Sequence, residues 1–471
     1  MTGTTLTCAL VAVVCACSPS KPVTPTAKDR FDAWLTAFNA GDRARLVAFH
    51  TAYWPYPKDD PGVDGELGFR SQTGGFEVKK VETATPTHAE LIVKERDSDQ
   101  FARAVIDIEA VTPHKVSNFV MNLISAPAGM GPARMTEAEA IAALRAELDK
   151  LTAADKFSGT VIVAKHGTPI FSGAYGLADR EHKIANTLDT RFRIGSMNKM
   201  FTAVGVIQLV QAKQLAVTDA LSKPLPAYPN TKLANKVTIH HLLTHTGGTG
   251  DIFGPEFDKH RKELRTLDDY VKLYGKRDLE FEPGAKWSYS NYGFLLAGVV
   301  IEAVSKQTYF DYVHDHVFVP AGMTSTSSPM EDEPNTDLKR SIGYMRDGQT
   351  LKPNTDTLPI RATSAGGGDS TVGDLLAFAN ALTANKLLDA EHTQLVTTGK
   401  VDTPGGAKYA YGFSDDLMDG VRCFGHGGGA PGMNGALTIC ANGYTIAVLA
   451  NLDPPAAGRV ERFALERLPL K

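Results

Sequence analysis

Ser196 and Lys199 stand three positions apart, just before an apolar segment that predicts a helix over residues 201–215. Residues three apart on a helix are neighbours on one face, so the lysine amine would lie beside the serine hydroxyl. Burial lowers the pKa of a lysine, and its neutral amine can then take the serine proton. The N–H groups at the helix start would stabilise an oxyanion there. The pair alone is weak evidence for catalysis, because a solvated lysine one turn after a capping serine gives the same pattern by chance.

A second motif supplies further groups for the same chemistry. Tyr289 and Asn291 are separated by one residue and precede an apolar segment, 294–300, that predicts another helix. A phenol in this place can transfer a proton, and an amide can hold a substrate carbonyl.

A third motif is rich in glycine. His426 is followed by three glycines, residues 427–429, ahead of a predicted strand that ends at residue 440. Glycines at a strand let backbone and ligand approach closely and leave N–H groups free to face a site. Cys423 and Cys440 flank this glycine-rich turn on two strands predicted to be antiparallel neighbours. They form either a disulfide in an oxidising compartment or two ordinary buried cysteines.

The order of these three motifs resembles the serine β-lactamase and penicillin-binding protein superfamily. The branch that it resembles most contains class C β-lactamases, D-alanyl-D-alanine carboxypeptidases and family VIII esterases. Residues 237–248 and 364–375 are also similar to this family, and the resemblance runs from about Thr136 to the C-terminus. It implies an α/β (α+β) fold, with a β-lactamase-like antiparallel sheet flanked by helices and an all-helical insert.

The resemblance also implies a serine hydrolase that works through a covalent acyl-enzyme and needs no metal or organic cofactor. It assigns catalytic roles to Ser196, Lys199 and Tyr289, and substrate binding to Asn291, His426, Gly428 and Gly429. Ser196 would attack the carbonyl, while Lys199 and Tyr289 would share the acid and base steps. Asn291 would orient the substrate carbonyl. The N–H groups of Ser196 and Gly429 would form the oxyanion hole.

One departure from the family pattern bears on the substrate. Where β-lactamases carry Lys-Thr-Gly, this chain has His426, Gly427 and Gly428. A mostly neutral histidine and a glycine without a hydroxyl hold a substrate carboxylate poorly. The sequence therefore predicts an esterase-like hydrolase of small ester or amide substrates. The alternatives are a β-lactamase or D-Ala-D-Ala carboxypeptidase and, from another class, a non-catalytic lipid-tethered binding protein.

His241 and His245 have the spacing of two zinc ligands on one helix face. The glutamate of a His-Glu-x-x-His motif is missing, and the residues after His245 end any helix there. We therefore expect a structural role for both histidines and no metal site.

The chain begins with an apolar run that is too short to span a bilayer. Residues 1–17 are predicted to be a signal peptide, although residues 1–5 contain no lysine or arginine. Cys17 ends a stretch that resembles a lipobox, so a plain export signal and a lipidated Cys17 that tethers the protein to a membrane both remain open. Either places the protein in the periplasm or cell envelope. Residues 18–28 form a proline-rich tether.

The net charge of −4, with no run of basic residues, argues against a nucleic-acid partner. A small-molecule acyl substrate fits better. The oligomeric state is left open by the sequence.

Two domains are expected. Residues 29–125 begin with a helix and continue with alternating segments at 75–81, 89–96 and 102–110, which indicates a small α+β domain. Its start weakly resembles the ketosteroid-isomerase-like cone fold. No acid–base pair is evident in it, so a docking or pocket module is predicted. Residues 126–135 are a linker, and 136–471 form the hydrolase domain.

Overall fold

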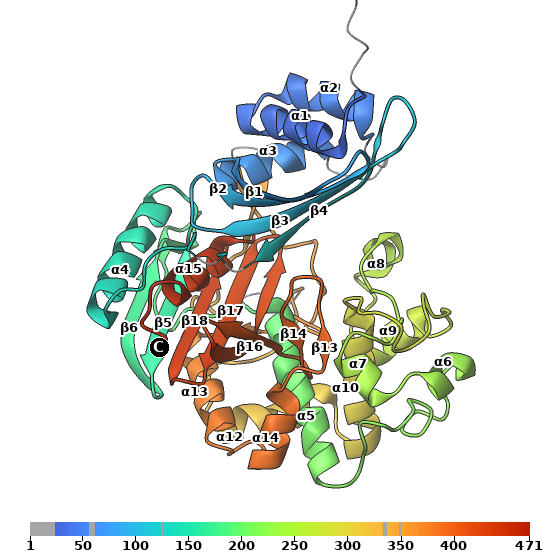
Figure 1. The fold of residues 1–471 in the computed structure, drawn as a ribbon. Coiled ribbons are helices and arrows are strands. Elements are labelled where there is room, and N and C mark those ends of the chain that lie inside the picture. Colours follow the sequence, from blue (N-terminus) through green and yellow to red (C-terminus); the bar gives the residue numbers. More distant parts are fainter. Residues whose placement is uncertain (1–23, 56–61, 125, 128, 333–336, 348–349) are drawn as a thin grey trace, which may run out of the picture.

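The computed structural model describes residues 24–55, 62–124, 126–127, 129–332, 337–347 and 350–471. The predicted signal peptide with Cys17, and the tether up to residue 23, lie outside the described residues. Figure 1 shows a small N-terminal domain lying on a larger one. Within the described ranges, no helix is long and apolar enough to cross a membrane.

The small domain places three helices against a four-stranded antiparallel sheet (Figure 1). The elements are α1 (Ala27–Ala40), α2 (Arg43–Tyr53), α3 (Gly62–Thr73), β1 (Phe76–Ala84), β2 (His88–Glu95), β3 (Phe101–Ile108) and β4 (Val116–Ile124), with strand order β1-β2-β3-β4. A capping box between Thr26 and Asp29 starts α1, and Gly41 in the left-handed conformation ends it. Of these strands, β4 is the one that the sequence did not single out.

The structure pairs a histidine with a carboxylate in this domain, a pair that was not evident in the sequence. His50 of α2 and Glu66 of α3 are paired inside the domain, with His50 Nε2 3.0 Å from Glu66 Oε1. The indole N–H of Trp34 donates to the same carboxylate at 3.3 Å. Aromatic side chains of the domain's core lie around the pair, among them Trp34, Phe38 and Trp54.

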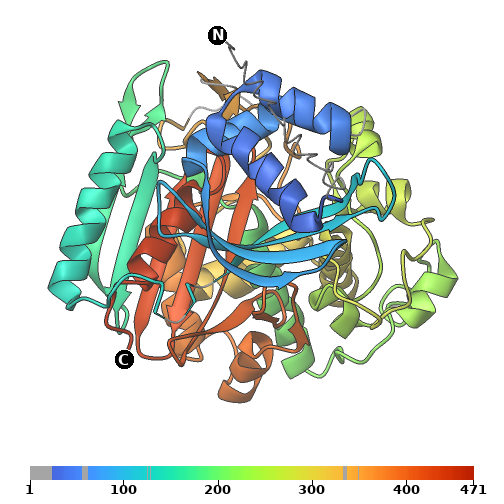
Figure 2. The ribbon, with the colours of Figure 1, turned by 45° about the horizontal axis from the view of Figure 1, so that its top comes forward.

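The large domain is built on an eight-stranded antiparallel sheet with the order β13-β14-β15-β16-β17-β18-β5-β6. Its strands are β5 (Gly159–Lys165), β6 (Thr168–Tyr175), β13 (Val401–Asp402), β14 (Lys408–Tyr409), β15 (Ser414–Met418), β16 (Val421–Ala430), β17 (Met433–Cys440) and β18 (Tyr444–Ala450). Helices α4 (Glu137–Ala153) and α15 (Ala456–Leu465) cover one face, and the helical region covers the other (Figure 2). The sheet therefore lies between two helical layers.

The helical region contains α5 (Asn198–Gln211), α6 (Thr231–Lys236), α7 (Ile239–Leu243), α8 (Pro255–His260), α9 (Leu267–Tyr274), α10 (Asn291–Ser305), α11 (Tyr309–Val313), α12 (Val319–Ala321), α13 (Val372–Thr383) and α14 (Ala390–Thr397). Short strands outside the main sheet pair two by two, β7 (Leu177–Asp179) with β8 (Ile184–Ala185), β9 (Phe192–Arg193) with β12 (Asp369–Ser370), and β10 (Tyr344–Asp347) with β11 (Thr350–Pro353). Helix α5 is buried nearly all round, as its apolar sequence requires, and α10 packs on it.

The apolar segment predicted as a helix over 201–215 is α5, which begins at Asn198 and ends at Gln211. Lys199 lies on its first turn, as its predicted position beside Ser196 requires. The glycine-rich segment predicted as a turn is instead the second half of β16, and the chain turns only after Ala430. The register that pairs Gly428 with Gly435 also pairs Cys423 with Cys440.

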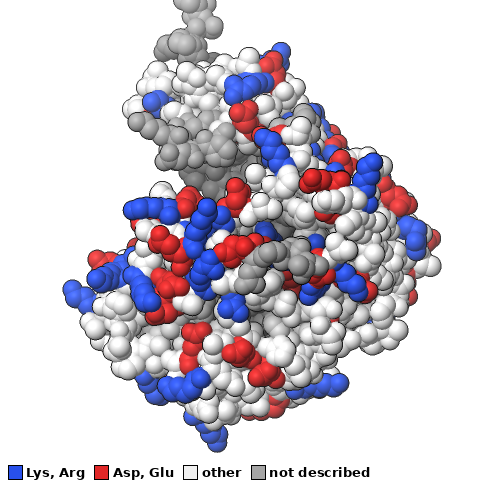
Figure 3. All heavy atoms as spheres, turned by 180° about the vertical axis from the view of Figure 1, so that it is seen from behind, with Lys and Arg blue, Asp and Glu red and all other residues white. Residues whose placement is uncertain are grey.

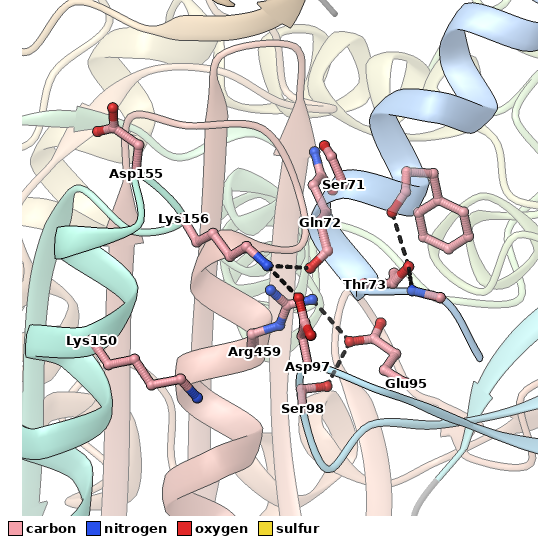
Figure 4. A network of polar contacts seen from close by, with 12 residues as sticks. Ser71, Gln72, Thr73, Glu95, Asp97, Ser98, Lys150, Asp155, Lys156 and Arg459 are labelled. Carbon is pink, nitrogen blue, oxygen red and sulfur yellow. Dashed lines mark hydrogen bonds and ion pairs between the residues drawn. The ribbon is translucent and has the colours of Figure 1, made fainter. Parts of the chain in front are cut away.

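The two domains meet through charged side chains (Figure 4). The guanidinium of Arg459, on α15, donates to Glu95 of β2 at 2.8 Å, and about 5% of each side chain is exposed. Lys156 donates to Asp97 at 2.7 Å and to the main chain of the small domain. The outer surface is also charged: the face seen in Figure 3 carries lysines and arginines interspersed with acids.

Candidate active site

A short helical turn places the serine beside the lysine. Gly195 has φ of +52°, and a side chain there would meet the end of Met433 at 2.2 Å. A 3₁₀ turn, Gly195–Met197, follows and leads directly into α5. The amine of Lys199 lies 3.1 Å from the hydroxyl of Ser196 as a result.

Three oxygen atoms surround the amine of Lys199, whose side chain is fully buried. The amide oxygen of Asn291 lies at 2.8 Å, and the carbonyl of Ala365 also accepts from the amine. These two oxygens can only accept, so they take the two N–H groups of a neutral amine. The lone pair is then left for the hydroxyl proton of Ser196. Burial lowers the pKa of Lys199 to about 7, which makes this neutral form available near neutrality.

The phenol of Tyr289 is the second group on the serine. The side chain of Ser290 accepts the N–H of Gly293 at 2.9 Å and caps α10, which places Tyr289 just before the helix and Asn291 on its first turn. The Tyr289 hydroxyl is hydrogen-bonded to Ser196. Burial raises the pKa of Tyr289 above its usual value, so the phenol keeps its proton at neutral pH.

The glycine-rich half of β16 passes directly against the serine turn. A Cβ atom at Gly428 would lie 2.1 Å from the carbonyl oxygen of Ile194 and 3.2 Å from the nitrogen of Ser196. The strand can approach this closely only without a side chain at that position. Gly429 follows, with its nitrogen 3.5 Å from where a Cβ atom on Gly195 would lie. The backbone nitrogens of Ser196 and Gly429 therefore lie on two segments that are in direct contact.

His426 is neutral, and both of its ring nitrogens are hydrogen-bonded within the protein. Its Nε2 lies 2.9 Å from the hydroxyl of Tyr409, and its Nδ1 is hydrogen-bonded to the carbonyl of Gly427. Nδ1 must donate to that carbonyl, so Nε2 accepts the Tyr409 hydroxyl. Burial lowers the pKa of His426 to about 4. This position therefore offers no positive charge at pH 7.

His245 packs against the site, whereas His241 caps a helix. Its Nδ1 accepts the N–H of Ser290 at 3.0 Å, and its ring centroid lies 4.3 Å from that of Tyr289. His241 instead caps α7 through the N–H of Thr238. No cluster of three or more metal-ligating side chains occurs among the described residues.

Sequence patterns did not single out Asp251, Tyr409 or the carbonyl of Ala365. The carboxylate of Asp251 accepts both bonds from the Asn291 amide nitrogen, at 3.0 and 3.1 Å. Ala365 lies in the stretch 364–375 that resembles the family, whereas Asp251 ends a glycine-rich loop that no residue spacing connects to Lys199.

Two cavities open at Ser196. One, of about 580 Å³, follows β16 past His426 and Gly427 toward α15. The other, of about 430 Å³, has largely apolar walls formed by Ile252, Phe253, Leu358, Pro359 and Met433. Ser196 and Tyr289 line both, so a substrate carbonyl at the serine can extend groups in two directions.

Cys423 and Cys440 form a disulfide between β16 and β17, with their Cα atoms 4.0 Å apart. Of the two alternatives that the sequence left open, the structure contains the disulfide.

The chain is similar to known proteins. The Beta-lactamase family profile matches residues 138–471. The chain is 30% identical to the putative penicillin-binding protein PbpX of Bacillus subtilis over 298 residues, 62% of this chain and 70% of that protein. It is 34% identical to penicillin-binding protein 4* of B. subtilis over 176 residues, which cover 36% of this chain and 38% of that protein.

Two solved structures also resemble it. The penicillin-binding protein from Bacillus halodurans superposes with a TM-score of 0.60 at 32% identity, covering 67% of this chain and 97% of that one. The D-stereospecific amidohydrolase from Streptomyces sp. gives 0.58 at 28% identity, covering 69% and 97%. Together with the placement of Ser196, Lys199 and Tyr289, these matches show that the chain belongs to the β-lactamase family, within the superfamily of serine β-lactamases and penicillin-binding proteins, and is a serine hydrolase.

Proposed function

We propose that the protein hydrolyses small ester or amide substrates through an acyl-enzyme on Ser196, with esterase-like specificity. The observation that carries the proposal is the position of the Ser196 hydroxyl. It lies between the lone pair of a neutral Lys199 and the phenol of Tyr289.

Acylation follows from these positions. Ser196 Oγ attacks the substrate carbonyl while its proton passes to Lys199, whose lowered pKa makes it the better base of the two candidates. The N–H groups of Ser196 and Gly429 stabilise the oxyanion; removing one such donor in other hydrolases costs about 10²–10³ in rate. Lys199 and Tyr289 return the proton to the leaving alcohol or amine. Asn291 orients the substrate carbonyl.

Deacylation repeats these steps with water in place of the serine. Water attacks the acyl carbonyl, gives its proton to the same base, and the serine oxygen leaves as the restored hydroxyl. No metal or organic cofactor takes part in the proposed sequence.

The choice of an esterase-like substrate rests on His426 and on the apolar cavity. A neutral His426 bonded to Tyr409, next to Gly427, provides no fixed charge for a substrate carboxylate. The cavity of about 430 Å³ offers apolar walls to an acyl group. The amide alternative is supported by similarity to the Streptomyces D-stereospecific amidohydrolase.

A β-lactamase or D-Ala-D-Ala carboxypeptidase is the second candidate, and the names of the Bacillus relatives favour it. It requires a carboxylate anchor other than His426. The candidate from another class, a lipid-tethered binding protein that does not turn over, is disfavoured by the hydrogen-bonded Ser196, Lys199 and Tyr289.

Export to the periplasm or cell envelope is part of the proposal, with residues 1–17 as signal and Cys17 as a candidate lipid anchor. The Cys423–Cys440 disulfide supports it, because such bonds persist in oxidising compartments. Mass spectrometry of the purified envelope form would show cleavage and any acyl mass on Cys17.

The activity is tested by exposing the protein to a fluorophosphonate, a short-chain acyl ester and a penicillin. Mass spectrometry locates any adduct, and hydrolysis rates rank the substrates. Adducts on Ser196 with faster ester turnover support the proposal. A stable penicillin adduct with faster β-lactam turnover supports the second candidate, and the absence of turnover on every substrate supports a binding protein.

A further inference from the structure

Asp251 is held firmly at the end of a glycine-rich loop between α7 and α8. The side chain of Ser290 donates to the carbonyl of Gly250 at 2.5 Å, and Arg277 donates to the carbonyl of Asp251 at 2.6 Å. The Asp251 carboxylate also accepts the N–H of Ile252 at 2.5 Å. These bonds aim the carboxylate at the start of α10, where Asn291 lies.

The carboxylate decides which way the Asn291 amide points. Both of its oxygens lie within 3.1 Å of Asn291 Nδ2. A carboxylate accepts but does not donate, so it selects the NH₂ end of the amide and turns the oxygen to the opposite side. That oxygen accepts from the amine of Lys199 at 2.8 Å.

The orientation of the amide in turn orients the base. With the oxygen of Asn291 and the carbonyl of Ala365 taking its two N–H groups, the neutral Lys199 amine presents its lone pair to Ser196. A flipped amide would present NH₂ to the same amine and compete with Ser196 for the lone pair.

We propose that Asp251 is a positioning residue: it holds the Asn291 amide in one orientation and thereby directs the lone pair of Lys199 onto Ser196. The inference rests on the proposed acyl-enzyme function, for which it names a further residue that does not itself touch the substrate.

Asp251 also acts on the titration of Lys199. Its negative charge raises the lysine pKa against the larger opposing effect of burial. The other titratable groups near the amine are neutral at pH 7: burial raises the pKa of Tyr289 and lowers those of His245 and His426. Removing the charge of Asp251 therefore lowers the pKa of Lys199, a change that a purely structural role would not produce.

The experiment compares wild type with Asp251→Asn, Asp251→Glu and a control, Asp268→Asn. Asp268 is an exposed acid on α9 whose partner is Lys272, so the control removes the same charge away from the site. The pH profile of kcat/KM is measured with a short-chain acyl ester, and folding is checked by Tm. In parallel, NMR of protein labelled with 13Cε-lysine follows the Lys199 amine, assigned with Lys199→Met, and needs no turnover.

For Asp251→Asn we expect kcat/KM to fall about tenfold at its optimum, because the base is no longer oriented. The acid limb of the pH profile and the pKa of Lys199 measured by NMR should both move down by about half to one unit. Asp251→Glu should restore much of the rate, and Asp268→Asn should resemble wild type. An unmoved Lys199 pKa in a folded Asp251→Asn protein overturns the inference. A wild type that turns over no ester or amide overturns the proposed function instead, and the NMR titration still decides the role of Asp251.

Discussion

The hydroxyl of Tyr409 lies 2.9 Å from Nε2 of His426, at the position where β-lactamases place a lysine. The imidazole accepts this bond in its neutral form, because burial lowers its pKa to about 4. The finding links the strand sequence to substrate choice, because a carboxylate-bearing substrate gains little from an uncharged, already bonded side chain.

Short-chain acyl esters should therefore be hydrolysed with a higher kcat/KM than penicillins or cephalosporins. Introducing His426→Lys together with Gly427→Thr should reduce this ratio at least about tenfold, because it supplies a charge and a hydroxyl for the carboxylate. Side-by-side kinetics on both substrate classes measure it. If the wild type already prefers β-lactams, the protein holds the carboxylate with another residue.

Ser196→Ala should abolish covalent labelling by a fluorophosphonate and reduce ester turnover by at least about 10³-fold, since the acyl-enzyme cannot form. The side chain lies at a turn, and its loss should leave Tm within a few degrees of wild type. Undiminished labelling of the alanine variant would falsify the assignment of the nucleophile.

Lys199→Met and Tyr289→Phe should each remove most of the rate, about 10²-fold or more. The double variant should lose much less than the product of the two losses, because both groups act on the same serine proton. A double-mutant cycle on kcat/KM measures the coupling. Losses that multiply would mean that the lysine and the tyrosine serve separate steps.

The lowered pKa of Lys199 also affects stability. Between about pH 7 and the usual lysine pKa of 10.5, the unfolded chain binds the proton that the folded state lacks, so stability rises with pH in this window. The penalty for burying the lysine is complete below about pH 7. Lys199→Met should thus stabilise most at about pH 6–7 and least near pH 10, as measured by Tm relative to wild type. A difference that does not vary with pH would show that the lysine is not strongly desolvated.

Gly428→Ala should damage both activity and stability, because its Cβ atom would lie 2.1 Å from a backbone oxygen of Ile194. Gly427→Ala is a matched control one residue away, where the nearest atom outside the adjoining residues lies at 3.5 Å. We expect a loss of ester turnover of about 10²-fold for the first and less than threefold for the second. Equal effects would mean that the close approach to the serine turn is unimportant.

Local spacing in the sequence predicted the pairing of the nucleophile with its base. Ser196 and Lys199 belong to one helix start, so their proximity follows from helix geometry alone. Tyr289 and Asn291 could be placed because both stand beside the start of an apolar helix. The family resemblance then brought these two segments and the glycines together.

Other features could not be predicted, because tertiary contacts decide them. Asp251 meets Asn291 across 40 positions in the chain, through a loop whose path depends on Ser290 and Arg277. The run of glycines after His426 predicts a turn, since glycine usually interrupts a strand. They continue the strand because Gly428 must pass against Ile194, a contact that no local pattern encodes.

The ion pairs between the two domains, here called the seam, have a consequence for how the protein unfolds. Among the described residues the buried apolar side chains of the two domains form separate clusters, and Glu95 with Arg459 closes the gap between them. Opening the seam leaves each cluster within its own domain and returns both ions to water, where they are solvated again. We therefore expect the small domain to melt as a separate cooperative unit, so that calorimetry should record two heat-absorption peaks rather than one.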